Sequence, residues 1–287
     1  MSNTLEAYRH SGKFKFSAVA LCFGSAAALG FPLGLAYAFF IGWVPFIYFN
    51  VLATLAYGFF FGWLTIKTLK AGQVRNTMLA ALCGLVAGLI ALYGEWSGHV
   101  HVLYKDAPWF LWPDQILGAM SYLYEHGSWG MHKGENFTGI PLALVWVAEA
   151  GFIVGLAAWL PYAFVKDTPF CEKTRCWLDE NKKIDTLEAI TDPAQLAALQ
   201  AGDIMPMVSA RPKAEGAMAF TRLLLKRSPQ CNVFCTLRVQ GITLSTDKKG
   251  NVTEKVVDFT RDLIIPASMF DLIAKFEEFK PGPPAPV

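Results

Sequence analysis

The chain has 287 residues, of which 54% are hydrophobic and only 17% are charged. A soluble domain usually carries about 25% charged residues, so this composition excludes an ordinary soluble globule, a disordered chain and a nucleic-acid-binding module. The average conceals a division, because residues 1–165 contain 15 charged side chains and residues 166–287 contain 33. We therefore predict an α-helical integral membrane domain over 1–165 and a small cytoplasmic α+β domain over 166–280.

Four apolar segments are each long enough to cross a bilayer. No charged residue occurs between Phe16 and Ile66, and a single span needs about 20 residues, so this stretch of 51 residues predicts two helices. Pro45 marks the break between them, because proline fits the first turn of a new helix. A polar, basic loop follows at 67–75. We expect the four spans at 16–41, 46–66, 76–94 and 141–165.

Lys and Arg near the ends of these segments predict the orientation. Seven lie at one set of ends, namely Arg9, Lys13, Lys15, Lys67, Lys70, Arg75 and Lys166. The other side has only Lys105 and Lys133. Because positive residues concentrate on the cytoplasmic side, we expect the N-terminus and the C-terminal domain to lie in the cytoplasm. The pattern is typical of a multi-pass protein of a bacterial inner membrane.

Each predicted span contains the spacing Gly-x-x-x-Gly. The pairs are Gly30/Gly34, Gly58/Gly62, Gly84/Gly88 and Gly151/Gly155. Lipid supplies little hydrophobic drive between helices, so close approach across small residues is a main source of their association. We interpret these pairs as packing faces, either within one chain or between copies in a homo-oligomer. The alternative is that glycine is simply common in membrane helices.

Glu149 is the one ionisable residue well inside a predicted span. An intramembrane carboxyl group is costly and therefore marks a functional-site candidate. It has Asn50, near the start of the second span, as a possible hydrogen-bonding neighbour. A protonated or hydrogen-bonded structural role is the alternative interpretation. The two residues define a possible intramembrane polar site.

Residues 95–140 form an aromatic-rich extracytoplasmic segment. The apolar residues between Asp114 and Glu125 fall on one helical face, which predicts a helix lying on the membrane surface. His99 and His101 would share one face of an extended segment, and imidazoles with carboxylates such as Glu95 suit zinc or copper. Interfacial histidines without metal are the alternative.

Two close cysteine pairs occur in the predicted cytoplasmic domain. They are Cys171 with Cys176 and Cys231 with Cys235. In a reducing compartment such pairs favour a four-thiolate zinc site over disulfides. The separation of the pairs exceeds that of a compact zinc ribbon, and buried thiols are the alternative. We predict that zinc serves as a structural cofactor here.

The rest of this domain has the pattern of a mixed α+β fold. Asp192 caps a short helix that Gly202 ends, and Gly241 suggests a β-bulge. The last stretch, 281–287, is rich in proline and is predicted to be disordered. The expected elements are helix 193–201, strands 217–226, 233–245 and 252–264, and helix 267–279.

No enzyme motif stands out, and basic and acidic residues nearly balance in 166–287, which speaks against a nucleic-acid partner. The leading hypothesis is a non-enzymatic protein whose four-helix anchor, embedded in the lipid bilayer, presents the α+β domain to a protein partner. The first alternative is an oligomeric channel or carrier that uses Glu149. The second is a membrane enzyme with a metal site at 95–140, built from His99, His101, Glu95 and Glu125.

Overall fold

The computed structural model describes residues 4–44, 46–104, 107–109, 111–127, 137–248 and 250–278. The chain divides into two compact units. One unit is Ser11–Asp167, and the other combines the first ten residues with Thr168–Val287. The proline-rich stretch 281–287 lies outside the described residues.

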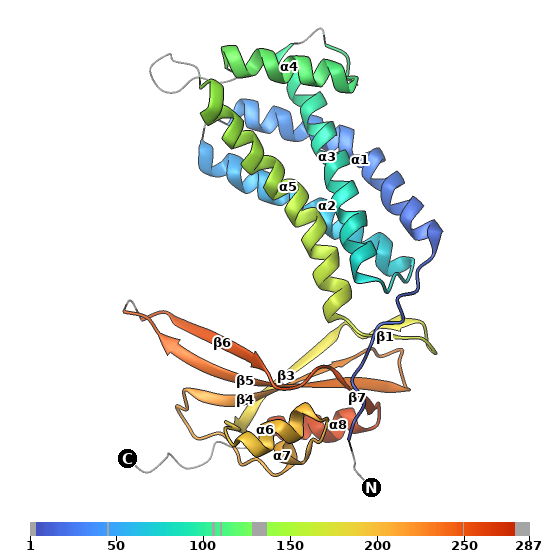
Figure 1. Cartoon of the computed structure of the whole chain (residues 1–287), viewed down its shortest axis with the longest axis vertical. Helices are drawn as coiled ribbons and strands as arrows, with labels where there is room; N and C mark the ends of the chain where they lie inside the picture. The colour runs from blue at the N-terminus through green and yellow to red at the C-terminus, as the bar shows by residue number, and fades with distance from the viewer. Residues whose placement is uncertain are drawn as a thin grey trace. The chain divides into compact units, whose positions relative to one another are not determined.

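The first unit contains four long apolar helices (Figure 1). They are α1 (Phe16–Trp43), α2 (Ile47–Ala71), α3 (Thr77–Leu103) and α5 (Gly139–Asp167). By length and composition all four could cross a membrane, which confirms the prediction of four apolar helices. Helix α2 continues to Ala71 and so includes the first part of the predicted loop at 67–75. The ammonium group of Lys67 lies 5.4 Å from the Trp63 ring.

Three of the four predicted glycine faces join helices within the chain. A Cβ atom on Gly34 would lie 2.4 Å from the backbone of Gly94 on α3, and one on Gly84 would lie 2.1 Å from the carbonyl oxygen of Ala157 on α5. The face of Gly58 meets Ile153 on α5 in the same way. By contrast, a Cβ atom on Gly151 or Gly155 would have nothing within 4 Å. That fourth face stays without a neighbour in the described chain, and the homo-oligomer remains a prediction.

Helix α4 (Pro113–His126) agrees with the helix expected after Pro113. Its Ile116 and Leu123 pack in a cluster with Trp96 of α3 and Leu111. The first residues of the predicted segment 95–140, up to Leu103, continue α3 as a helix, and the extracytoplasmic location of the segment stays a prediction. Residues 128–136, which follow α4 in that segment, lie outside the described residues.

The second unit is an α+β fold with two antiparallel sheets, as predicted. The larger sheet has the order β3-β4-β5-β6, and β7 also pairs with β5. A small hairpin joins β1 (Phe170–Cys171) to β2 (Cys176–Trp177). The helices lie along one face of the larger sheet (Figure 1). The remaining elements are β3 (Glu180–Glu188), α6 (Pro193–Gln200), α7 (Met205–Val208), β4 (Ala219–Arg227), β5 (Phe234–Thr246), β6 (Val252–Asp258), β7 (Leu263–Pro266), α8 (Met269–Ala274) and a 3₁₀ turn (Lys275–Glu278).

Two details of the predicted sheet are wrong. The single strand expected at 252–264 is two strands, β6 and β7, which pair with different parts of β5. Gly241 is not a bulge, because it stays in register with both neighbouring strands. A Cβ atom there would lie 2.3 Å from the Phe259 ring, so the aromatic ring that folds over the sheet explains this glycine.

The N-terminal residues are part of the α+β unit. Ala7 forms a β-bridge with Leu263 of β7, and the Ile264 N–H donates to the Glu6 carbonyl at 2.8 Å. The Leu5 N–H donates to the Gly202 carbonyl at 2.9 Å. The segment before the first long helix, which the sequence analysis considered only for its charge, thus completes the edge of the sheet beside β7.

Candidate functional site

Four polar side chains from the four long helices form what we call the carboxylate cluster, namely Tyr37, Thr54, Glu95 and Glu149. The Tyr37 hydroxyl on α1 donates a hydrogen bond to Oε1 of Glu149 on α5. It lies 2.6 Å from Oγ1 of Thr54 on α2, and Thr54 donates to the backbone carbonyl of Asn50 at 3.0 Å. Three helices thus supply one connected set of hydroxyl and carboxyl groups.

Glu95 on α3 completes this cluster. Its side chain is only 5% exposed, and its Oε2 has no hydrogen-bond partner among the residues that the structure describes. Glu95 follows Ala91 by one helical turn. The Ala91 carbonyl oxygen accepts the hydroxyl of Tyr57 at 3.0 Å, and the Tyr57 ring stacks on Tyr37. The bundle therefore holds a buried carboxyl group at Glu95 and a half-buried one at Glu149, of which only Glu149 was predicted from the sequence.

The close contact of α1 with α3 explains why Glu95 is buried. Gly34 packs against Gly94 and Glu95 so tightly that a Cβ atom on Gly34 would lie 2.5 Å from the Glu95 nitrogen. Tyr37 follows Gly34 by one helical turn, and its ring stacks on Tyr57 of α2 at 4.9 Å between centroids. A side chain at position 34 would separate the helices, so the glycine is a condition for the cluster.

Asn50 lies one turn nearer the start of α2 than Thr54. Its backbone carbonyl accepts the Thr54 hydroxyl, while its side-chain Oδ1 is buried and has no partner among the described residues. Asn50 is therefore connected to Glu149 only indirectly, from its backbone carbonyl through the side-chain hydroxyls of Thr54 and Tyr37. Neither hydroxyl group was predicted from the sequence, because such hydroxyl groups are common in membrane helices and do not by themselves indicate a site.

The predicted zinc site is wrong. Among the described residues, no group of three or more His, Cys, Asp or Glu side chains could hold a metal ion. Cys171, Cys176 and Cys231 are buried in a small apolar cluster with Leu178. Cys235 instead belongs to the main core, and its thiol lies 3.7 Å from the Pro266 carbonyl oxygen. Cys231 and Cys235 thus lie in different clusters, so the four sulfur atoms do not surround one point. All six cysteines are free and buried.

The two cysteines of the second pair have different acidity. Burial raises the pKa of the Cys235 thiol to about 11, and the neighbouring Cys231 adds to this effect. Burial also opposes ionisation of Cys231, but hydrogen bonds with the backbone of Phe234 and with the thiol of Cys171 outweigh it, so its pKa is lowered. Cys231 is therefore the more nucleophilic of the two thiols.

The structure does not bring His99 and His101 together, and the described residues contain no group of three or more side chains that could hold a metal ion. The two residues lie on the helix α3, where residues two apart point in nearly opposite directions. His99 packs edge-on against Trp96 at 5.8 Å between centroids. Nδ1 of His101 lies 2.7 Å from the Ala107 carbonyl oxygen. The shared face required an extended segment, and helix formation separates the pair.

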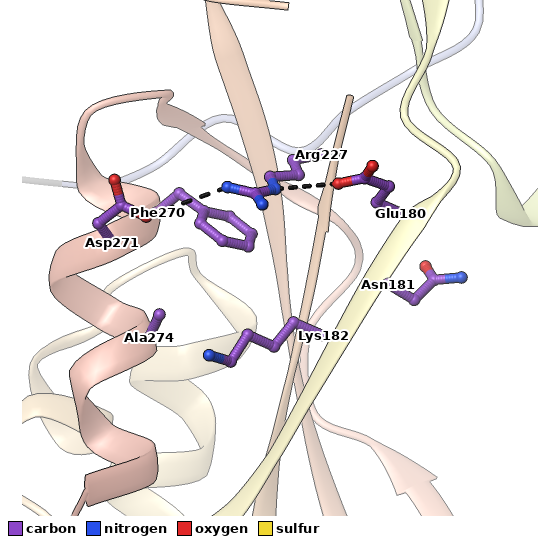
Figure 2. A pocket seen from close by; sticks show the side chains of 7 residues that line it. All are labelled: Glu180, Asn181, Lys182, Arg227, Phe270, Asp271 and Ala274. Carbon is purple, nitrogen blue, oxygen red and sulfur yellow. Dashed lines mark hydrogen bonds and ion pairs between the residues drawn. The ribbon is translucent and has the colours of Figure 1, made fainter. Parts of the chain in front are cut away.

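The α+β unit has a pocket of about 340 Å³ between the start of β3 and α8 (Figure 2). Its two cations are already paired. Arg227 lies 3.1 Å from Glu180 and covers the Phe270 ring at 4.3 Å, and the Lys182 ammonium lies 2.7 Å from Glu277. Because the charges of the wall neutralise each other, this pocket offers little to attract a charged ligand.

The opposite edge of the sheet is open at β6. All seven residues of β6 are exposed, and among the described residues no strand pairs with its outer edge. Beside it, the corresponding edge of β7 is covered by the N-terminal residues. The strand is held in place by Arg222 of β4, which binds Asp185 of β3 at 2.6 Å and Glu254 of β6 at 2.9 Å. The open edge is thus exposed and is joined to the rest of the sheet by these ion pairs.

Comparisons with protein-family models, with curated proteins and with solved structures find no match for this chain.

Proposed function

We propose that this chain is a non-enzymatic, multi-pass membrane protein that presents its α+β unit to a protein partner, and that an extended segment of the partner adds to strand β6. The open edge of β6 is the observation that carries the proposal. An unpaired edge strand presents a row of backbone N–H and C=O groups, which is a template for a further strand.

The side chains of β6 support recognition as well as pairing. Val252, Val256 and Val257 are 60%, 47% and 48% exposed, so they offer apolar contacts to the side chains of an added strand. Proteins usually protect such edges with a covering segment or a bulge. Here the covering N-terminal segment protects β7 and leaves β6 free, which favours a partner at this position.

Four apolar helices and the distribution of Lys and Arg support the location. An even number of spans puts both ends of the chain on one side of a membrane, in agreement with the N-terminal residues that pair with β7. The seven basic residues near those ends favour the cytoplasmic side. The partner is therefore expected to be a cytoplasmic protein.

A photoreactive amino acid at Val257 tests this proposal in cells. The matched control is Val208 on α7, which is also 48% exposed but lies in the helical layer. We expect a crosslinked partner from position 257 and none from 208, and we expect Val256→Lys to reduce the yield at least fivefold. Equal crosslinking from both positions would contradict the proposal, as would products that contain only copies of this chain.

A further inference from the structure

We propose that Glu95 and Glu149 hold one proton between them and form a proton-binding site inside the four-helix unit. The site lies outside the surface used in the proposed function and does not depend on it. It joins α3 and α5 to α1 and α2 through the carboxylate cluster. Its ligand is the hydrogen ion, and the described contacts supply the reasons for this choice.

The first reason is the absence of a compensating charge. Within the described residues of α1, α2, α3 and α5, the only Lys and Arg are Lys67, Lys70 and Lys166, all in the last two turns of α2 or α5. Burying an ionised carboxylate without a partner is very unfavourable, and two neighbouring carboxylates repel each other. One bound proton removes a charge and gives the pair a hydrogen-bond donor.

The second reason is the kind of atom that lacks a partner. Oε2 of Glu95, which is buried without a hydrogen bond among the described residues, is an acceptor when ionised and a donor when protonated. Glu149 already accepts a hydrogen bond from Tyr37. The contacts thus suit an ionised Glu149 beside a protonated Glu95, with the proton available to either group.

The other titratable groups around the pair do not supply a positive charge. Tyr37 of α1 donates to Glu149. Tyr57 of α2 donates to backbone carbonyls, at 3.0 Å from the oxygen of Ala91. His99 of α3 lies one turn beyond Glu95 and packs against Trp96. Because none of these described groups supplies a positive charge, a proton is the ligand that the two carboxyl groups share.

The hydroxyl groups also indicate a direction of access. Tyr37 precedes the end of α1, and Thr54 follows the start of α2, by six or seven residues each, which is about 10 Å along a helix. Asn50, to which Thr54 donates, lies one turn closer to that end. The hydroxyl groups thus extend from Glu149 toward the turn between α1 and α2, and we place proton exchange on that side.

Infrared spectroscopy of the full chain in lipid nanodiscs, in Na⁺-free buffer at neutral pH, tests the proposal. We expect a C=O stretching band of a protonated carboxyl group that shifts in D₂O. The band is expected to be lost in Glu95→Gln/Glu149→Gln and unchanged in Glu125→Gln, whose carboxyl is exposed on α4. Tyr37→Phe keeps both carboxyl groups but removes the donor that stabilises ionised Glu149, so the proton is expected to move toward Glu149 and the band to shift.

Three results would overturn the proposal. They are the absence of the band in the unmodified chain, its persistence in the double variant, and its loss when Na⁺ is added, since the last would mean that a metal cation occupies the site. If the double variant does not fold, as judged by its elution as an aggregate, the Tyr37→Phe shift decides. An unshifted band in that variant would place the protonated carboxyl elsewhere.

Discussion

Cys231 and Cys235 show how neighbouring residues of one type acquire different chemistry. Both are buried, but the Cys231 thiol has a lowered pKa and the Cys235 thiol has a pKa of about 11. At pH 8 a thiol with a pKa near 11 is ionised in about one molecule in a thousand. The spacing of the two residues suggested a shared metal, but their surroundings assign them to two different clusters.

We therefore expect iodoacetamide to modify Cys231 at least tenfold faster than Cys235 at pH 8, because the thiolate is the reactive form. Mass spectrometry of peptides from the intact protein measures both rates. Raising the pH from 8 to 9 is expected to increase the rate at Cys235 about tenfold, since its pKa lies above this range. Equal rates at the two residues would contradict the assignment.

Arg222 links three strands through charged side chains. Its hydrogen bond lowers the pKa of Glu254. A carboxyl group with a lowered pKa in the folded state stabilises the fold above its unfolded pKa, and this contribution is lost as the pH falls through the folded value. The β5–β6 hairpin is thus expected to loosen in acid.

Hydrogen exchange of peptides from β6 tests this pH dependence. In the unmodified chain the protection of β6 is expected to fall as the pH drops below the usual range of glutamate, after correction for the intrinsic exchange rate. In Arg222→Met the protection is expected to be lower at neutral pH and to change less with acid. A variant with the same pH profile as the unmodified chain would contradict the role of Arg222.

Glu95 was predicted to follow the third span because that span was ended before the first charged residue. The spacing of Gly84, Gly88, Ala91 and Glu95 continues one helical face, and this pattern was available in the sequence. That Glu95 joins the carboxylate cluster was not available, because it depends on how α3 packs against α1 and α2. A helix pattern gives a direction for each side chain but does not identify what it faces.

At the scale of elements, the glycine faces separate into those that pack and one that does not. Gly34 faces the α3 backbone, which cannot move aside as a flexible side chain would, whereas Gly155 has open space. The four pairs are identical as sequence motifs. Only the positions of the neighbouring helices distinguish them.

Gly34→Leu is expected to destabilise the four-helix unit by about 3 kcal/mol, the upper end for overpacking, because backbone atoms block the new side chain. Gly155→Leu, the matched control, is expected to leave the stability of the chain unchanged. Thermal unfolding followed by the reaction of a thiol dye with the buried cysteines compares the variants. A change in oligomeric state caused only by Gly155→Leu would support the predicted homo-oligomer.

Strands were predicted less completely than helices. Apolar residues nearly alternate in β5 and form a short run in β4, and both strands were predicted within two residues of their ends. Strand β3 was missed because only Ile184 and Leu187 are buried in it, and a register shift between them interrupts the alternation. The division of 252–264 into two strands depends on where each pairs along β5, which is a tertiary property.

At the scale of the whole molecule, the first ten residues join the C-terminal unit. The Tyr8 hydroxyl accepts a hydrogen bond from the Phe170 N–H at 2.9 Å and lies 3.2 Å from the Phe170 carbonyl oxygen, to which it donates. Its ring also stacks on Phe234. These contacts connect the N-terminal segment to the hairpin β1–β2 and to the start of β5.

Tyr8→Phe is expected to reduce the local stability around Phe170 by about 1–2 kcal/mol, because two backbone groups lose their partner. Hydrogen exchange of the peptide 168–178 is the measurement, and faster exchange by about fivefold or more is the expected result. Tyr124→Phe on the exposed side of α4 serves as control. Unchanged exchange in Tyr8→Phe would show that these hydrogen bonds contribute nothing.

The shared unit also predicts that Thr4 and Lys248 lie on the same side of the membrane. A cysteine introduced at either position is expected to resist a membrane-impermeant thiol reagent in intact cells and to react in inverted vesicles. Labelling of both in intact cells would reverse the predicted orientation. Labelling of only one would contradict the pairing of the N-terminal residues with β7.

The sequence by itself determined the number of long apolar helices and the presence of an α+β unit, because both follow from local composition and periodicity. It also suggested Glu149, since a single carboxyl group stands out in an apolar run. Only the tertiary structure decided that Glu95 joins it, that the cysteines do not form a metal site and that the N-terminus covers β7. These features depend on contacts between residues far apart in the chain, which short-range patterns do not encode.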